Sequence, residues 1–208
     1  MKTRWEPCGL CALAACLMLT GCNTTYDSTN FRAHPPRSIL VLPPLNETTA
    51  VKGTYGTLST VTFPLAEMGY YVYPVAVTDH FLKENGMPTA GEMHAVPLDK
   101  IREIIGADAV LYLTLKDYKT RYFFYFCTTT VAVEGKLVDT RTGLILWEGK
   151  GKHREIVAGS PLDIAVYQML FTSMDHAHEI SGAANANLIK MKDHGLPYGP
   201  YHPKAESQ

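Results

Sequence analysis

Between residues 38 and 115, short apolar runs alternate with stretches of helical periodicity, and this order constrains the fold more than any other feature. The apolar runs have the length and the Gly or Pro neighbours of strands buried in a sheet, and they occupy residues 38–42, 69–74 and 109–115. The segments between them carry apolar residues at spacings of three and four and stop at a glycine, as helices do. Helices are therefore expected over residues 55–69, 78–86 (capped by Thr78) and 98–106, with a loop over 86–97. Pro64 lies inside the first of these, so either a kink or a helix that begins at Pro64 is expected there. Strands that alternate with helices predict an α/β domain whose helices flank the sheet.

Residues 122–151 follow a different pattern, because they show no helical period. Val131, Val133 and Leu137 alternate with small or polar neighbours, as in a strand with one covered face. Residues 139–143 contain turn formers and a glycine where positive φ is needed, so residues 144–151 are expected to return as the second strand of a hairpin. One mixed β-sheet is therefore predicted.

The clearest helix is the long C-terminal one. Ser160 is a good N-cap, Pro161 suits the first helical position, and Asp163 favours the positive end of a helix. A stripe at spacings of three and four predicts one face packed on the sheet, and it comprises Leu162, Val166, Met169, Ser173, Ala177, Ile180, Ala184 and Leu188. The Pro- and Gly-rich residues 193–208 are expected to form an irregular arm.

The first 22 residues have the order of features found in a bacterial lipoprotein leader. Lys2 and Arg4 precede an uncharged stretch over residues 8–19, which is too short to span a bilayer as a helix. Leu-Thr-Gly-Cys at residues 19–22 then resembles the lipobox of bacterial lipoproteins. The resemblance implies cleavage between Gly21 and Cys22 and attachment of diacylglycerol to the Cys22 thiol, with acylation of the new amino terminus. The alternative, that Cys22 is one more cysteine of an apolar leader, is disfavoured by the combined pattern.

Removal of residues 1–21 from the 208 leaves 187, enough for one domain with a real core. The predicted organisation is a leader over 1–21, a lipidated tether over 22–37, an α/β domain over 38–192 and the arm over 193–208. The residue after the lipidated cysteine is Asn23 rather than the Asp that typically retains lipoproteins at the inner membrane of enteric bacteria. Anchoring to the outer membrane by palmitate-type chains, with the domain in the periplasm, is the expectation.

Charge and cysteine usage narrow the function classes. The formal net charge is −1 and no basic stripe is visible along the chain, so no nucleic-acid partner is expected. Three of the five cysteines leave with the leader and Cys22 carries lipid, so Cys127 stands alone and an intramolecular disulfide is excluded.

No enzyme site or cofactor is predicted. Asp175, His176 and His178 invite a metal site, but histidines two apart on a helix point away from each other, so none is expected. Cys127 lacks a recognisable protease signature and is interpreted as a small buried hydrophobe. Ser160 is explained as a helix cap, and the Gly53–Gly56 segment lacks the lysine of a phosphate loop.

Five consecutive aromatics, Tyr122, Phe123, Phe124, Tyr125 and Phe126, are the unusual feature. In a strand, neighbouring side chains face opposite sides, so both faces of this segment would be aromatic. An exposed aromatic patch marks a protein or membrane contact. The alternative is that a helix, or the C-terminal arm with Tyr198 and Tyr201, covers the second face. The sequence leaves both open, and these seven residues are the candidate partner-binding set.

The lipobox, ILVLPPLNET at 39–48, GYYVYPV at 69–75 and DTRTGLILWEG at 139–149 together resemble a family of Gram-negative outer-membrane lipoproteins typified by a conserved Neisseria lipoprotein and associated with CsgG-type lipoproteins. The resemblance covers residues 36–203. It implies a fold like the N-terminal domain of TolB and a periplasmic interaction or assembly role, with a CsgG-type lipoprotein as partner, and it brings no established activity. A regulator of a peptidoglycan synthase is the second hypothesis, and a hydrolase with an unrecognised site is the third.

Overall fold

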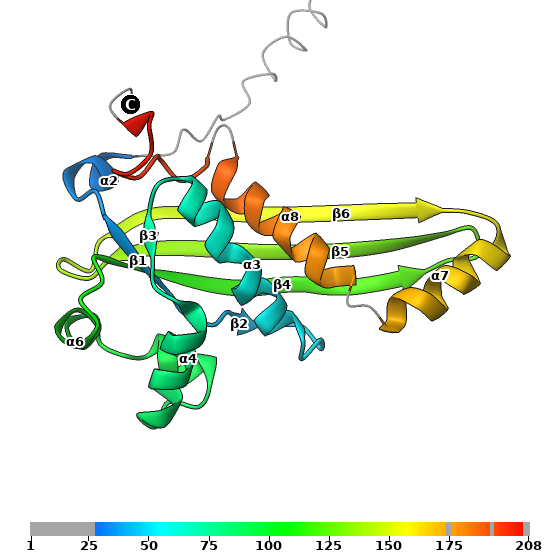
Figure 1. Ribbon diagram of the computed structural model, residues 1–208, viewed down its shortest axis with the longest axis horizontal. Helices are drawn as coiled ribbons and strands as arrows, with labels where there is room; N and C mark the ends of the chain where they lie inside the picture. The colour runs from blue at the N-terminus through cyan, green and yellow to red at the C-terminus, as the bar shows by residue number, and fades with distance from the viewer. Residues whose placement is uncertain (1–27, 174–175, 192–193, 206–208) are drawn as a thin grey trace, which may run out of the picture.

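A six-stranded mixed sheet organises the chain (Figure 1). The strand order is β3-β1-β4-β5-β6, and β2 pairs with β4 beyond the end of β1. β1, β2 and β3 run parallel to their neighbours, whereas β4, β5 and β6 are antiparallel. The strands are β1 (Ser38–Val41), β2 (Leu45–Asn46), β3 (Tyr71–Val72), β4 (Ala109–Tyr122), β5 (Phe126–Asp139) and β6 (Ile145–Ala158).

Seven helices are described. They are α2 (Thr29–Ala33), α3 (Gly53–Glu67), α4 (Val75–Glu84), α5 (Ala90–His94), α6 (Leu98–Ile104), α7 (Pro161–Ser173) and α8 (His176–Lys190). This computed structural model describes residues 28–173, 176–191 and 194–205, so the predicted leader, its cleavage after Gly21 and the lipidation site Cys22 lie outside the described residues. No helix in the described part of the chain is long and apolar enough to cross a membrane.

The sheet separates two apolar clusters. The larger one joins α3, α8 and the C-terminal arm to one sheet face, and Leu65, Leu113, Trp147 and Leu188 are among its members. The smaller one joins α4, α5 and α6 to the opposite face around Leu40. The prediction of a mixed sheet flanked by helices in a single domain is confirmed.

Glycines allow α8 to lie close against the sheet. An added Cβ on Gly151 of β6 would meet the carbonyl oxygen of Ala184 at 2.3 Å and Cβ of Leu188 at 2.5 Å. An added Cβ on Gly135 of β5 would lie 3.2 Å from both Leu188 and Trp147. The α8 backbone therefore occupies the space of a side chain at Gly151, and the Leu188 and Trp147 side chains occupy that space at Gly135.

Three helix ends follow the sequence, but one predicted helix start does not. Gly69, Gly86 and Gly106 have φ of 84°, 84° and 82° just after α3, α4 and α6, as predicted from their positions. The prediction that Thr78 caps a helix is wrong, because α4 begins at Val75 and Thr78 lies inside it with its hydroxyl donating to the carbonyl of Pro74. The fixed φ of proline before Val75 starts the helix a turn earlier.

The loop predicted over residues 86–97 contains α5. Its five residues are too few for a periodic stripe, so the pattern of apolar residues could not reveal it. A capping box nevertheless marks its start, in which the Thr89 hydroxyl accepts from the Glu92 amide and the Glu92 carboxylate accepts from the Thr89 amide.

Both ends of the domain differ from the predicted boundaries. Phe31 of α2 is buried in the larger cluster, and the Asn30 side chain donates to the carbonyl of Ile145, so the expected tether joins the folded body from Thr29 onward. The arm is irregular in its described part but packs against the body, where the Trp147 indole donates to the carbonyl of His194. A single aromatic at residue 31 forms no periodic pattern, so the sequence did not indicate that this residue packs in the core.

The C-terminal apolar stripe belongs to two helices rather than one face of one helix. Ala177, Ile180, Ala184 and Leu188 of α8 are buried as predicted, but Leu162, Val166 and Met169 of α7 are exposed. α8 crosses the sheet, whereas α7 lies beside the far ends of β4, β5 and β6 (Figure 1). The three long strands continue beyond the last pairing of β1 and β2, and residues 117–132 and 152–158 with α7 are called the distal arm.

Candidate interaction surface

The aromatic run forms the tip of the distal arm. Tyr122 ends β4 and Phe126 begins β5, and the Phe123 amide donates to the Phe126 carbonyl at 2.7 Å to close the turn. The prediction that the run is one strand is therefore wrong. β4 and β5 pair in register up to Tyr122 and Cys127, so the chain has to reverse between these two residues.

The tip side chains are exposed and contact one another. Phe124 is 69% exposed and Tyr125 62%, and Phe123 and Phe126 are less so. The rings of Phe123 and Phe126 stack with centroids 4.4 Å apart, and those of Phe124 and Tyr125 meet edge to face at 4.9 Å. The division of the run into two alternating faces does not hold, because the residues surround a turn.

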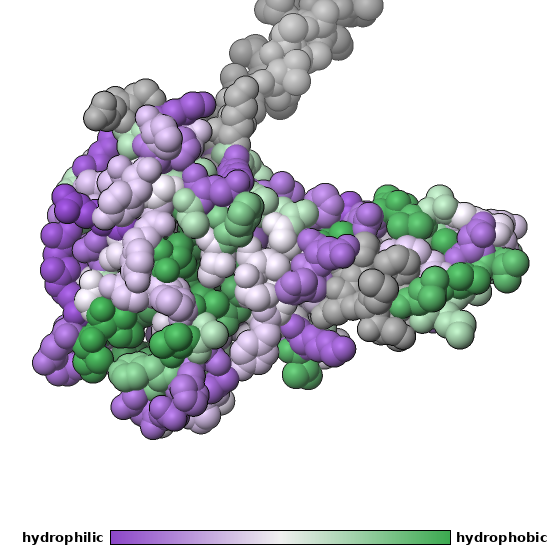
Figure 2. All heavy atoms as spheres, viewed as in Figure 1, coloured by the Kyte–Doolittle hydropathy of each residue, from purple (hydrophilic) through white to green (hydrophobic). Residues whose placement is uncertain are grey.

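α7 extends this apolar character along the arm. Its start is fixed by Ser160, whose hydroxyl and amide donate to the Asp163 carboxylate, and by the Gly159 amide, which donates to the Tyr125 carbonyl. The two bonds from Ser160 lower the pKa of Asp163. The Ser160 hydroxyl also accepts from the Asp163 amide, which confirms Ser160 as a helix cap. The distal apolar surface is defined as Phe123, Phe124, Tyr125, Phe126, Leu162, Val166, Met169 and Leu170, all exposed. Figure 2 shows hydrophobic side chains gathered at this end of the molecule.

Beneath α7 the arm is buried and offers no nucleophile. Cys127 is 1% exposed, and burial raises the pKa of its thiol. Burial also raises the pKa of Tyr167, on the side of α7 near Cys127, to about 12. A protonated, covered thiol is a poor nucleophile, which agrees with the interpretation of Cys127 as a small core residue.

Tyr198 and Tyr201 do not join the aromatic tip. Tyr198 stacks on His202 with centroids 3.9 Å apart, and the neighbouring Pro197 carbonyl accepts from the Tyr70 hydroxyl. Both tyrosines belong to the segment that packs near α2 and the end of α3, at the end of β6 opposite the tip. The hypothesis that the C-terminal arm covers the aromatic run is therefore wrong.

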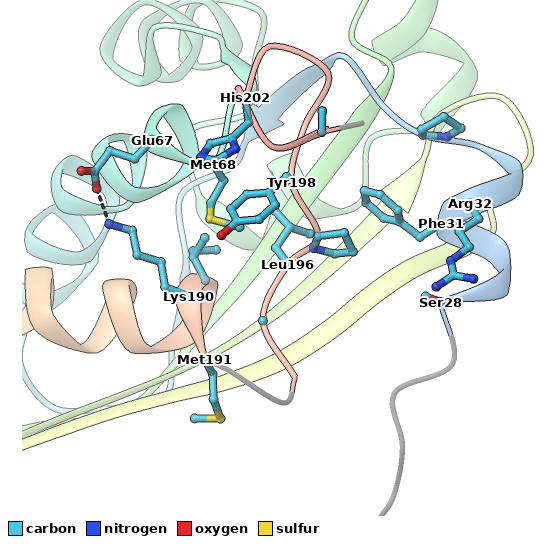
Figure 3. Close-up of a pocket in the computed structure, with 15 residues that line it drawn as sticks. Ser28, Phe31, Arg32, Glu67, Met68, Lys190, Met191, Leu196, Tyr198 and His202 are labelled. Carbon is cyan, nitrogen blue, oxygen red and sulfur yellow. Dashed lines mark hydrogen bonds and ion pairs between the residues drawn. The ribbon is translucent and has the colours of Figure 1, made fainter. Parts of the chain in front are cut away.

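A cleft of about 950 Å³ lies beside this C-terminal segment. Figure 3 shows Leu196 and Tyr198 between Met68 and Phe31. Lys190 pairs with Glu67 at its rim. The lining residues Phe31, Met68 and Leu196 are buried and belong to the larger apolar cluster.

Of the residues considered as metal ligands, only the side chain of His178 is described. His178 of α8 is exposed, and Asp175 lies outside the described residues. Across the described ranges, no three His, Cys, Asp or Glu side chains are grouped so as to hold a metal ion.

The distal arm is what the sequence did not foresee. α7 was expected to lie on the sheet as part of a longer helix. Residues 161–173 contain one charged side chain, and a helix with so few charges is normally buried, so its exposure on the arm is unusual.

Comparison with known proteins places the chain among lipoproteins. A family model described as "Putative lipoprotein GNA1162-like" matches residues 26–201. Putative lipoprotein NMB1124/NMB1162 of Neisseria meningitidis serogroup B is 39% identical over 200 residues, which are 90% of this chain and 93% of that protein.

Two solved structures complete the comparison. The crystal structure of lipoprotein GNA1162 from Neisseria meningitidis matches with a TM-score of 0.56 and 42% identity, over 67% of this chain and 99% of that one. The C-terminal domain of LpoB from Salmonella enterica matches with a TM-score of 0.41 and 20% identity, over 66% of this chain and 90% of that one, which is too weak a likeness to argue from.

Proposed function

Because this chain belongs to the GNA1162-like lipoprotein family, we propose that it is a lipid-anchored envelope protein that holds a partner protein through its distal apolar surface. It acts by binding and not by catalysis. Attachment through Cys22 keeps the domain at the membrane, and the arm carries the contact away from the body.

The exposure of α7 carries this proposal. Met169 is 79% exposed and Leu162 72%, on a helix that carries a single charged side chain, Asp163. Apolar area of this extent is costly in water, at about 25 cal/mol for each Å². Patches of this kind mark binding sites on soluble domains.

The hairpin makes the tip a rigid binding element. β4, β5 and β6 pair continuously to the end of the arm, and the tip rings are already packed on one another before a partner arrives. Little conformational entropy is therefore lost when the aromatics bind. Large, preorganised aromatics are the side chains that dominate protein interfaces.

Replacing Phe124 with alanine is expected to weaken partner binding about thirtyfold, which corresponds to about 2 kcal/mol. The thermal midpoint should stay unchanged, because the ring contributes little to the core. The affinity for the partner identified below, measured with purified proteins, tests this. Phe63→Ala is the matched control, since Phe63 of α3 is also 69% exposed but lies on the body. Loss of binding in Phe63→Ala with none in Phe124→Ala would place the contact elsewhere.

A CsgG-type lipoprotein is the proposed partner, on the resemblance of the sequence motifs alone. A peptidoglycan synthase is the alternative, in which case the protein is a regulator of that enzyme. Co-purification from detergent-solubilised envelopes separates these two partners. The protein that co-purifies with wild type but not with Phe124→Ala identifies which of them is bound. Recovery of the same proteins with both would count against the distal apolar surface.

The outer membrane is the proposed location, with the domain in the periplasm. Asn23 follows the lipidated cysteine, so the processed protein is expected in the outer-membrane fraction. Replacement by aspartate should move it to the inner membrane in an enteric host. Separation of the two membranes on a density gradient measures this, and a wild-type protein found mainly in the inner membrane would contradict it.

A further inference from the structure

The distal arm has a second face, opposite α7. Side chains alternate across a sheet, and Cys127, Thr129 and Val131 of β5 point toward the side of α7 and α8. Their neighbours in sequence point the other way. Pairing aligns Arg121 with Thr128 and Ile156, Lys119 with Thr130 and Arg154, and Asp117 with Ala132 and Lys152.

This second face carries positive charge. Arg121, Lys152 and Arg154 are exposed, so no described element covers them. Within the described residues, none of the three has a carboxylate at ion-pair distance. Lys119 pairs with Asp117 at 2.7 Å, the one acidic side chain in these three rows. The cationic face is defined as Arg121, Lys152 and Arg154.

The half of the same face nearer the body is neutralised instead. Lys150 pairs with Glu134 at 2.8 Å, and Lys116 pairs with Glu47 at 2.7 Å. Lys116 and Lys150 near the body are therefore paired with carboxylates, and Lys136 lies over the Tyr112 ring, whereas Arg121, Lys152 and Arg154 of the arm have no such partner in the described residues. The sequence does not reveal this cationic face, because its residues come from β4 and β6, about thirty residues apart in the chain, and alternate with other residues.

We propose that the cationic face binds the anionic phospholipid headgroups of the membrane to which the protein is anchored. The face belongs to a three-stranded ribbon, and its cations stand apart. Residues two apart on a strand are about 7 Å from each other, and residues two strands apart about 10 Å, so each cation meets a separate phosphate. Ile156 and Phe126 lie on the same face near the tip and are exposed, which suits the apolar layer just below the headgroups.

The predicted attachment site keeps this face near lipid. Ser28 is six positions after Cys22, a stretch of chain that reaches at most about 20 Å. The body end of β6 contacts α2, where the tether begins, and the tip is twelve or more residues away at about 3.3 Å each. The arm therefore reaches the membrane only when the molecule lies along it, and contact through the cationic face would turn α7 away from the lipid. This inference does not depend on the partner proposed above.

Binding to vesicles tests the proposal. The mature chain, residues 22–208, carries Cys22→Ser so that it bears no lipid, and every core residue named here lies between Phe31 and Leu196. It is expected to sediment with vesicles that contain one quarter phosphatidylglycerol in phosphatidylcholine, and not with pure phosphatidylcholine. Each Lys or Arg beside an anionic surface strengthens binding about fivefold, or about 1 kcal/mol. Arg121→Gln, Lys152→Gln and Arg154→Gln together should therefore weaken binding on the order of a hundredfold, and added salt should weaken the parent in the same direction.

Controls separate this face from other surfaces. Lys52→Gln, Lys100→Gln and Arg102→Gln together remove the same charge from the body and should leave binding unchanged. Circular dichroism with a thermal scan confirms that each variant is folded. Equal binding to neutral vesicles, or a triple arm variant that binds like the parent, overturns the proposal. Loss of vesicle binding in Phe124→Ala alone, with the triple arm variant intact, would instead assign the lipid contact to the tip and also overturn it.

Discussion

Replacing Gly151 with alanine is expected to lower the free energy of unfolding by about 3 kcal/mol or more. The new Cβ would lie 2.3 Å from the carbonyl oxygen of Ala184 and 2.5 Å from Cβ of Leu188. These atoms belong to the backbone and stem of α8, so a rotamer change cannot make room and the helix has to move away from the sheet. α8 joins the larger apolar cluster to the sheet, and the displacement would loosen Trp147 and Leu188.

A thermal scan measures this effect. For a domain of this size, about 3 kcal/mol lowers the thermal midpoint by roughly 10 °C. Gly182→Ala is the matched control, because Gly182 lies in α8 and an added Cβ there comes no nearer than 3.9 Å to another residue. That change should raise stability by about 0.5 to 1 kcal/mol, since glycine disfavours a helix interior. A destabilised Gly182→Ala beside an unaffected Gly151→Ala would refute the close packing of α8.

Replacing Cys22 with alanine is expected to abolish lipid attachment and leave the precursor uncut. In the proposed processing, the Cys22 thiol accepts the diacylglyceryl group, so no other side chain at this position should replace it. Each buried methylene of an attached chain contributes about 0.8 kcal/mol to membrane binding, and all of it is lost with the cysteine. The protein should then retain its 21-residue leader and all 208 residues.

Incorporation of a labelled fatty acid, read together with the mass of the product, tests the role of Cys22. Cys16→Ala and Cys127→Ala are the controls, since the first lies in the leader and the second is buried in β5. Both should be labelled like wild type. Undiminished labelling of Cys22→Ala would mean that the lipid is attached to another residue, and it would refute the proposed motif.

The sequence indicated which residues could form the candidate surface but not how they are arranged. Five aromatics in a row pointed to an unusual contact, and the exposure of Phe124 and Tyr125 agrees with that hypothesis. Their arrangement around a turn did not follow from the run itself, because aromatics favour strands and no glycine or proline interrupts residues 122–126. The register between Tyr122 and Cys127 imposes the turn.

Local sequence decided the elements whose causes are local. Apolar period and helix-ending glycines placed α3 and α6, and the hairpin turn at Gly143, with φ of 71°, followed from residue type. These features depend on the conformations open to a few neighbouring residues. The mixed sheet followed from the same patterns taken in order.

Only the tertiary structure decided which apolar stripe is covered. α7 and α8 share one continuous period in the sequence, but α8 finds Gly151 and Gly135 beneath it, whereas α7 lies on the narrow arm and leaves Leu162 and Met169 in solvent. A hydrophobic period shows that a face can be buried and says nothing about the width of the surface available to bury it. The cationic face also depends on tertiary structure, because Arg121 and Arg154 share a surface only through the pairing of three strands. The residue pattern within any one strand does not reveal that pairing.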